Sequence, residues 1–573
     1  MRLVKTVIVA LICVVAIHAQ TNRGAISGTV MDQNGAAVPG ATVTVTNIGT
    51  NQSTKVTTSG DGSYSVNSLD PVEYRIVVEA TGFKKAIIEK VKVDTASNAT
   101  ANLALETGAV AETVTVVDNA ALINTESGAT TQTISERQLR DLPLNNRSVL
   151  DLAVTAPNVS GDAGSEDPEV TSGQPVPGFN LNLNGGRSGS TAILADGVNN
   201  TGVGIARAVV SFTPETVQEF TVQTSVYSAE YGQTGGGVIN ATTKSGTNRY
   251  NGTALWYNRN PTFNARPYRI GTTPRTPNNL RYNQVSFTVG GPVYLPHFGE
   301  GGPALYDGHD RTFFFFALEP RWRQDFVTTT TLFPTLTERS GDFRNLVRTN
   351  SGWLPTSVAA QFAGQSANAT SSVGPSAIYQ QYTINNGRLV PIVLSGGRWF
   401  CQFGATAAQG MTLVNGQPQC PANTPIVDAL NVIPKEFIDP IASKILKFQP
   451  EGTGYFLDNG VLRNAVLERQ VTQNEKRYTL RLDHQLTDDN RVNFRYTLTP
   501  AIGVRNFGSD VNGSTGVFSD AKQILLGDDH TFSATVVNSL KLNYTRGVFS
   551  EDFAPEFSIN GGRNLATELG IKS

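Results

Sequence analysis

The chain has 573 residues, a formal net charge of −2 and only 16% charged residues. A chain of this length exceeds one compact domain, so several folding units are expected. The charge shows neither the basic excess typical of nucleic-acid binding nor the acidic block typical of a solvating tail. Segments rich in Thr, Val, Asn and Ser, together with 55 glycines, favour strands and turns and predict a mainly β fold.

Residues 1–19 have the pattern of a secretory signal peptide. Arg2 and Lys5 precede an apolar run from Val7 to Ile17, and Ala19 supplies a small residue at a cleavage point. The run is too short to cross a bilayer as a helix. We therefore expect an exported protein, with a buried N-terminal helix as the alternative interpretation.

Two cysteines, Cys401 and Cys420, remain once the signal peptide is removed. They lie in one Gly- and Pro-rich stretch, and in an exported protein such a pair predicts a disulfide that closes a loop. Two free buried thiols are the alternative. No later stretch has the length of apolar sequence that a spanning helix needs, but the strands of a membrane barrel leave only a weaker, alternating pattern.

Residues 23–105 carry short alternating apolar segments, such as Ile26–Val30 and Tyr74–Val78. Turn sequences separate them, including Asp32-Gln33-Asn34-Gly35. Short strands with regular turns predict a small β-sandwich. The connector that follows, residues 106–119, contains one β-prone hexapeptide, which is suited to pairing with the sheet edge of another protein. The hexapeptide is Glu112, Thr113, Val114, Thr115, Val116 and Val117.

Residues 120–245 mix helix and strand patterns. Ser135 and Gln138 have the spacing of a helix-capping pair, and Pro214 is placed to begin a second helix. The stretch between them is rich in Gly, Asn and Pro. This region is therefore predicted to be a loop-rich α/β domain.

Residues 246–573 show long strands that alternate between apolar and polar residues. One pair flanks the turn Thr487–Asn490, and another is predicted to turn at Val537–Ser539. Each strand is predicted to have about ten residues, as in a barrel with lipid outside and water inside. The short turns contrast with the long segment Thr328–Val471. A soluble sandwich also alternates, but its strands are usually shorter.

The chain ends at Ser573 in a loop-like sequence and not in an amphipathic strand. After the long insertion, residues 246–573 leave room for about eight to twelve strands, and an open sheet edge cannot face lipid. We therefore expect an incomplete antiparallel transmembrane β-barrel that belongs to a longer protein.

The segment Val217–Gly246 resembles the end of the plug domain in TonB-dependent outer-membrane receptors. The matching elements are Tyr231-Gly232, Gly235–Asn240 and Thr243–Gly246. Their glycines permit tight turns and the close backbone approach that a domain packed inside a barrel needs. The resemblance implies that residues 120–245 form a plug.

Three further motifs resemble the Oar-like group of these receptors: Leu142–Arg147, Asn184–Arg187 and Asp196-Gly197. The first departs from the group pattern, because Asn146 stands where Gly is usual. The N-terminal sandwich resembles a carboxypeptidase regulatory-like domain, which has a carbohydrate-binding-like fold.

The resemblance implies active import across the bacterial outer membrane. In that case Glu112–Val117 resembles a TonB box, which would pair with a TonB-type periplasmic energy-coupling protein; a plain linker strand is the alternative. The other expected partners are outer-membrane lipid and an extracellular ligand, which could be a glycan, a metal chelate or a peptide. A surface protein for adhesion, signalling or protein export on the same scaffold is the second hypothesis.

The sequence offers no pattern typical of catalysis. Five histidines occur, and none has the spacing of a zinc site. Asp528-Asp529-His530 is interpreted as a solvated turn and not a metal site. The aromatic run Phe313–Phe316 is expected to face lipid, and ligand contacts are expected from loops around Pro175–Thr201. We predict no catalytic residue, no cofactor and no metal site, and therefore no enzyme.

Overall fold

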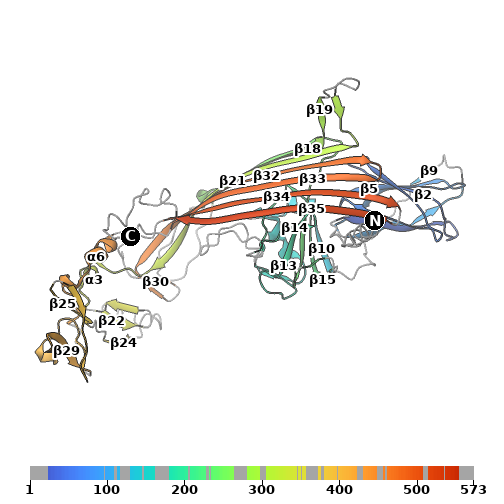
Figure 1. Cartoon of the computed structure of the whole chain (residues 1–573). Coiled ribbons are helices and arrows are strands. Elements are labelled where there is room, and N and C mark those ends of the chain that lie inside the picture. The colour runs from blue at the N-terminus through green and yellow to red at the C-terminus, as the bar shows by residue number, and fades with distance from the viewer. Residues whose placement is uncertain are drawn as a thin grey trace, which may run out of the picture.

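The computed structural model describes residues 23–553 with interruptions, the longest of which are residues 116–129, 162–177, 264–279 and 356–371. The predicted signal peptide lies outside the described residues. The main regions are an N-terminal sandwich, a central domain and one large curved sheet (Figure 1). The mainly β fold class is confirmed.

The N-terminal sandwich consists of two sheets, with strand orders β3-β2-β5-β6-β9 and β4-β1-β7, where β8 also pairs with β1. Alternate residues point into the shared core, so Val43, Ile76 and Ile26 are fully buried. Burying one such side chain stabilises the fold by about 1.5–3 kcal/mol. The strands are β1 (Gly24–Asp32), β2 (Thr42–Asn47), β3 (Ser53–Thr57), β4 (Ser63–Leu69), β5 (Glu73–Glu79), β6 (Lys85–Lys92), β7 (Asn98–Thr100), β8 (Leu103–Leu105) and β9 (Thr113–Thr115).

The central domain is built on a sheet of order β10-β15-β16-β13-β14. The predicted capping pair is confirmed, because the Ser135 side chain and the Gln138 side chain each bond the backbone of the other at the start of α2. The second predicted helix is wrong: Pro214 lies in a turn that leads directly into β15. The elements are β10 (Thr130–Ser135), α2 (Glu136–Asp141), η1 (Val149–Thr155), β11 (Val159–Gly161), β12 (Leu181–Leu183), β13 (Thr191–Ala195), β14 (Val198–Asn199), β15 (Val217–Ser225) and β16 (Gly237–Thr243).

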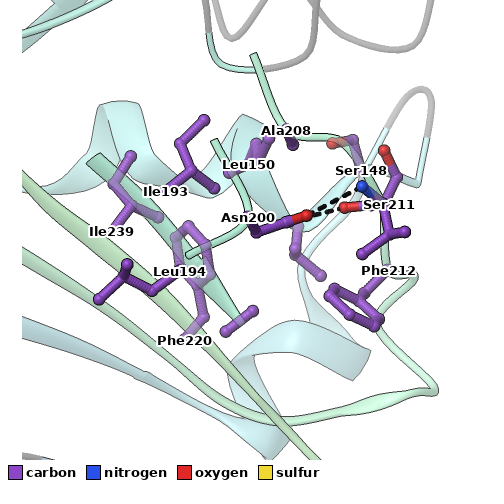
Figure 2. A pocket seen from close by; sticks show the side chains of 13 residues that line it. Ser148, Leu150, Ile193, Leu194, Asn200, Ala208, Ser211, Phe212, Phe220 and Ile239 are labelled. Carbon is purple, nitrogen blue, oxygen red and sulfur yellow. Dashed lines mark hydrogen bonds between the residues drawn. The ribbon is translucent and has the colours of Figure 1, made fainter. Parts of the chain in front are cut away.

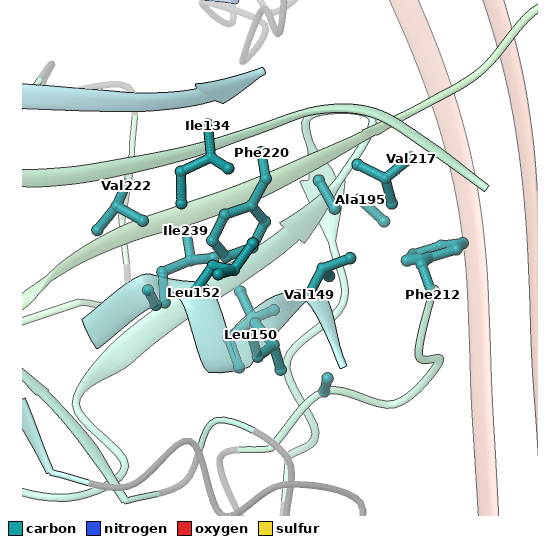
Figure 3. Close-up of a cluster of buried hydrophobic side chains, with 14 of the residues drawn as sticks. Ile134, Val149, Leu150, Leu152, Ala195, Phe212, Val217, Phe220, Val222 and Ile239 are labelled. Carbon is teal, nitrogen blue, oxygen red and sulfur yellow. The ribbon is translucent and has the colours of Figure 1, made fainter. Parts of the chain in front are cut away.

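The core of the central domain lies between its sheet and the short helix η1. Figure 3 shows Val149, Leu150 and Leu152 of η1 packed against Phe220 and Ile239 of the sheet. β15 and β16 are buried on both of their faces, because the other face of the sheet is also covered. Part of that cover comes from the domain itself, because Tyr231 packs against Ala192, Leu194 and Val238.

The large sheet has strand order β17-β18-β21-β32-β33-β34-β35, and every neighbouring pair is antiparallel. In Figure 1 the central domain lies against the middle of these strands, and the sandwich lies at the end that carries the short turns. The strands are β17 (Asn251–Arg259), β18 (Arg281–Pro292), β21 (Thr312–Thr331), β32 (Ala465–Thr487), β33 (Asn490–Asn506), β34 (Ser514–Ser533) and β35 (Val536–Phe553).

Burial in the large sheet is the reverse of that in a water-soluble protein. Polar side chains such as Arg477, Thr497 and Gln523 are buried, whereas Leu542 and Tyr544 are 60% and 55% exposed. A sheet with an apolar outer face and a polar inner face is typical of a membrane barrel wall.

Three expectations about these strands are corrected. β32 has 23 residues, not about ten. Its backbone pairs with β21 from Ala465 to His484 and with β33 from Val471 to Thr487, so the strand extends beyond the segment that alternates between apolar and polar residues. Val537 to Ser539 lie within β35, so the predicted turn comes earlier in the chain. Phe313 and Phe315 are 1% and 5% exposed and so lie on the covered face, because successive residues of a strand alternate between faces.

The segment between β21 and β32 forms several small elements at the far end of the large sheet (Figure 1). Cys401 and Cys420 are joined by a disulfide within it, next to the pairing of β27 with β29. The elements are α3 (Leu336–Arg339), β22 (Leu346–Thr349), β23 (Gly352–Pro355), β24 (Ser372–Pro375), β25 (Tyr382–Asn385), β26 (Arg388–Pro391), β27 (Arg398–Phe400), η3 (Ala407–Gln409), β28 (Thr412–Val414), β29 (Gln417–Pro421), η5 (Lys435–Phe437), α6 (Pro440–Lys447), β30 (Phe456–Asp458) and β31 (Val461–Arg463). The remaining short elements are η2 (Pro261–Phe263), β19 (Tyr294–Pro296) and β20 (Leu305–Asp307).

Candidate interface between the three regions

The sandwich meets the large sheet at a cluster of buried ion pairs. Arg23 precedes β1, pairs with Asp70, and donates from Nη2 to Asp529 Oδ2 over 2.7 Å. Asp70 also pairs with Arg491 of β33. These side chains are at most 15% exposed, so water screens their charges little.

The same cluster continues to the central domain through β32. Arg491 Nη2 donates to Asp483 Oδ1 at 3.0 Å, and Arg481 Nε donates to Asp483 Oδ2 at 2.9 Å. Arg481 Nη1 donates to the carbonyl oxygen of Thr243 at 2.8 Å and lies 3.9 Å from Asp196 Oδ1. A continuous series of charged contacts therefore links all three regions.

Asp196 is positioned by the two-residue turn between β13 and β14. Asp196 and Gly197 have φ values of 51° and 75°, as a type I′ hairpin turn requires. The Asp196 carboxylate accepts the N–H and the hydroxyl of Thr243, both at 2.8 Å, and its Oδ2 lies 2.7 Å from Arg495 Nε. An Asp-Gly motif thus holds a carboxylate against the arginines of the large sheet.

These contacts form one unit, which we call the interdomain ion-pair network. Its members are Arg23, Asp70, Asp196, Arg481, Asp483, Arg491, Arg495 and Asp529. The four arginines and four aspartates balance in charge. Such balance matters because removing one partner of a buried pair leaves an uncompensated charge, at a cost of about 3–5 kcal/mol.

The two aspartates from outside the large sheet are held in their ionised form. Burial by itself would raise the pKa of Asp70, but the charges of Arg23 and Arg491 outweigh it and hold that pKa well below its usual range. Burial also opposes ionisation of Asp196, and Arg495 with Arg481 lowers its pKa in the same way. Mild acid is therefore not expected to break these pairs.

The sandwich also contacts the central domain directly. The backbone N–H of Thr95 donates to Glu219 Oε1 at 2.6 Å, and the hydroxyls of Thr95 and Thr242 lie 3.1 Å apart. Lys92 Nζ lies 3.8 Å from the other carboxylate oxygen of Glu219. Burial raises the pKa of Glu219 to about 7, so this contact is sensitive to pH near neutrality.

Hydrogen bonds and an aromatic contact that involve at least one side chain join the central domain to the large sheet at several further places. Gln523 Nε2 donates to the carbonyl oxygen of Asn199 at 3.0 Å, and Glu319 pairs with the hydroxyl of Thr213. Arg147, the last residue of the Leu142–Arg147 motif, pairs with Glu215 and lies over the ring of Tyr257 at 4.0 Å. The two sheets do not share a strand pair among the described residues.

The hexapeptide Glu112–Val117 is described only at Thr113–Thr115, which form β9. β9 pairs in parallel with β6 of the sandwich, with Lys85 opposite Thr113, Ala86 opposite Val114 and Ile87 opposite Thr115. Glu112, Val116 and Val117 lie outside the described residues.

A small pocket in the central domain is lined mainly by apolar carbon. Figure 2 shows Asn200 and Phe212 among its lining residues. The Asn200 side chain is engaged with Val210, donating to its carbonyl oxygen at 2.8 Å and accepting its N–H at 2.9 Å. The amide is therefore used to fix the chain and is not directed at a ligand.

Among the described residues, no cluster of three or more His, Cys, Asp or Glu side chains is placed to hold a metal ion. Within the same part of the chain, no helix has both the length and the apolar character needed to span a membrane. The interpretation of Asp528-Asp529-His530 as a solvated turn is wrong, because these residues lie in β34 and Asp529 binds Arg23.

Most of the network could not be identified from the sequence. Asp196 belongs to an Asp-Gly motif and Asp70 to the turn sequence Asp70-Pro71, but neither motif indicates a distant partner, and no local pattern marks Arg23 or Arg491. The sequence places Arg481 and Asp483 on the polar face of a strand but indicates no partner for either residue. The available signal was the alternation of charged residues with Leu480 and Leu482 along β32, since a face that carries full charges beside a lipid-facing one must find partners.

Comparisons with known proteins agree with this organisation. Residues 242–573 match a family described as outer membrane beta barrel domain, and residues 25–106 match the carboxypeptidase regulatory-like domain. The TonB-dependent transporter Oar of Myxococcus xanthus is 27% identical over 279 residues, which cover 47% of this chain and 25% of that protein. The chain thus aligns with about a quarter of that relative.

Solved structures give weaker likenesses. The outer membrane transporter YddB from Escherichia coli is 11% identical with a TM-score of 0.36, over 73% of this chain and 38% of that one. Hydroxyquinol 1,2-dioxygenase from Pseudomonas putida is 10% identical with a TM-score of 0.13, over 16% of this chain and 58% of that one.

Proposed function

The chain belongs to the outer membrane beta barrel domain family and is a TonB-dependent receptor-like protein of the outer membrane, and on this premise we propose that it serves energy-coupled import. The large sheet would form part of the barrel wall, and the central domain would be the plug. The extracellular ligand would bind above the plug, and force from the periplasm would move the plug aside.

One observation carries this proposal: the central domain contacts the polar face of the large sheet through side chains, not through strand pairing. Side-chain ion pairs and hydrogen bonds can break and re-form with new partners one at a time. A shared strand would instead join the two regions into one sheet through a continuous set of backbone hydrogen bonds. The domain is thus attached in a way that permits displacement as a unit. A barrel wall and a plug that can move relative to it are the two parts that gated import requires.

Energy coupling is proposed to act on Glu112–Val117 as the TonB box. This hexapeptide precedes the central domain and follows the sandwich, so a pull on it would be transmitted to both. Strand addition by a TonB-type protein would use main-chain hydrogen bonds, which a β-prone segment readily supplies. No catalytic role is assigned to any residue.

Deletion of residues 112–117 tests the import proposal. Cells that express the protein would be given a labelled ferric chelate, a labelled oligosaccharide and a labelled peptide, and uptake would be measured with and without an uncoupler. We expect a probe whose uptake needs both the hexapeptide and the proton gradient. Uptake that survives the deletion with the same energy dependence would contradict energy-coupled import. Deletion of the exposed turn residues 33–35 serves as the control.

A second function, attachment at the cell surface, is supported by the disulfide-bonded segment beyond the large sheet. Its apolar side chains Val393, Leu413 and Trp399 are 75%, 67% and 48% exposed. Exposed apolar groups of this kind favour contact with another surface. Replacing all three with Ser would weaken cell adhesion if attachment is the role, and would leave energy-dependent uptake unchanged.

A further inference from the structure

The edge of β6 in the sandwich is already occupied by part of this chain. β6 pairs on one side with β5 and on the other with β9, so β9 is the last strand of the five-stranded sheet. β9 is also the described part of the proposed TonB box. The segment that would bind the energy-coupling protein is therefore bound to the sandwich in this structure.

The chain before β9 is fastened along the same edge. The N–H of Lys84 donates to the carbonyl oxygen of Glu106 at 2.8 Å, and the N–H of Gly108 donates to that of Gly82 at 3.2 Å. Lys84 Nζ and Glu106 Oε2 form an ion pair at 3.5 Å. These contacts bring the connector alongside the start of β6, so β9 continues an interaction that begins several residues earlier.

The sandwich that carries this edge is itself fixed in place. Arg23 and Asp70 bind Asp529 and Arg491 next to the short turns of the large sheet. In outer-membrane barrels the short turns lie on the periplasmic side. The β6 edge is thus held on the side from which an energy-coupling protein would approach.

We propose that the β6 edge is a binding site for the coupling segment, which stores β9 until an energy-coupling protein competes for it. The inference rests on the proposed function and adds a site to it. An unpaired β-prone segment would be a template for unwanted strand pairing, and seating it on β6 covers one of its edges.

The stored pairing is weak enough to be reversed. It comprises three residue pairs in parallel, which is the slightly less stable arrangement per residue. A partner that pairs with all six residues of Glu112–Val117 would form a longer ladder. Competition therefore favours the partner when it is present and β6 when it is absent.

A disulfide placed across the register tests this site in the full chain extracted from outer membranes. Ile87 and Thr115 are opposite one another, so the double variant Ile87→Cys/Thr115→Cys is expected to cross-link on oxidation. The matched control is Lys55→Cys/Thr115→Cys, because Lys55 lies on β3 at the opposite edge of the same sheet. Alkylation followed by mass spectrometry would report the cross-link.

The second measurement is the affinity of each variant for the purified periplasmic domain of a TonB-type protein. We expect oxidation of Ile87→Cys/Thr115→Cys to weaken binding at least about tenfold, which corresponds to about 1.4 kcal/mol. Reduction should restore the affinity. The control pair should neither cross-link nor respond to oxidation.

Three results would overturn the storage site, the last of them together with the proposed energy coupling. Failure of the 87/115 pair to cross-link would show that β9 does not occupy β6. A cross-linked protein with unchanged affinity would show that the partner adds to the outer edge of β9, so that no competition exists. A cross-linked protein that binds no partner in either redox state would instead refute the proposed energy coupling, and the storage role with it.

Discussion

The sandwich and the large sheet bury opposite kinds of side chain. In the sandwich Val43 and Ile76 are inside, as in any domain folded in water. In the large sheet Arg495 and Thr497 are inside, while Leu542 is 60% exposed. The difference shows that the two faces of the large sheet have different surroundings. The apolar face is suited to lipid, and the polar face binds the other two regions.

The largest effect is expected where the polar face meets the central domain. Asp196→Asn should lower the free energy of unfolding by about 3–5 kcal/mol, because it leaves Arg495 buried without its carboxylate partner, whereas Arg481 keeps Asp483. Asn tolerates the positive φ of this position, so the turn is retained. Denaturant unfolding in detergent would measure the loss.

The matched control for that change is Asp520→Asn, which removes the exposed partner of Lys522. An exposed pair of this kind contributes about 0–1 kcal/mol. Equal losses for the two variants would show that the buried network is no more important than a surface ion pair.

The next largest effect is expected on the opposite face of the same sheet. Leu542→Arg should cost about 2–4 kcal/mol in a bilayer, because it places a charge on the lipid-facing side of a barrel strand. Ile48→Arg in the sandwich, at a position 39% exposed, should cost no more than about 0.5 kcal/mol. Folding titrations in lipid vesicles would compare them, and similar costs would contradict a lipid-facing Leu542.

A smaller effect, and one that depends on pH, is expected at the contact between the sandwich and the central domain. The pKa of Glu219 is raised from 4.5 to about 7, so the folded protein keeps a proton that the unfolded chain has lost in this range. The contribution of protonated Glu219 to stability is complete below about pH 4.5 and is lost as the pH rises through about 7. The free energy of unfolding should fall by no more than about 1.4 kcal/mol per pH unit in this range.

Glu219→Gln removes the titrating group and should flatten the dependence of stability on pH between these values. Thermal unfolding measured from pH 4 to 8 would test it. A variant that keeps the wild-type slope would assign the pH dependence to another group.

The smallest effect concerns a local feature within the central domain. Ser135→Ala removes the side chain that caps α2 and should cost about 1 kcal/mol, whereas Ser135→Thr should cost less because it retains the hydroxyl. Amide hydrogen exchange in α2 would detect the difference. Equal exchange in both variants would show that tertiary packing, not the cap, holds the helix.

Local patterns predicted much of the fold and little of the interface. The cap at Ser135 and the Asp196-Gly197 turn depend on neighbours in the sequence, and both could be recognised in advance. The errors at Phe313 and at Val537 arose because alternation by itself does not state which face is covered or where a strand must turn. The partners of Arg23 lie 47 and 506 residues away, so no local pattern could have indicated them.

The sequence by itself determined the order of the regions, the mainly β class and the alternation of the long strands, because each follows from side chains a few residues apart. Only the tertiary structure decided that the polar strand face carries an ion-pair network reaching the sandwich, and that β9 is seated on β6. Both depend on which distant strands come together, and buried charges and open strand edges find partners only once the regions have packed.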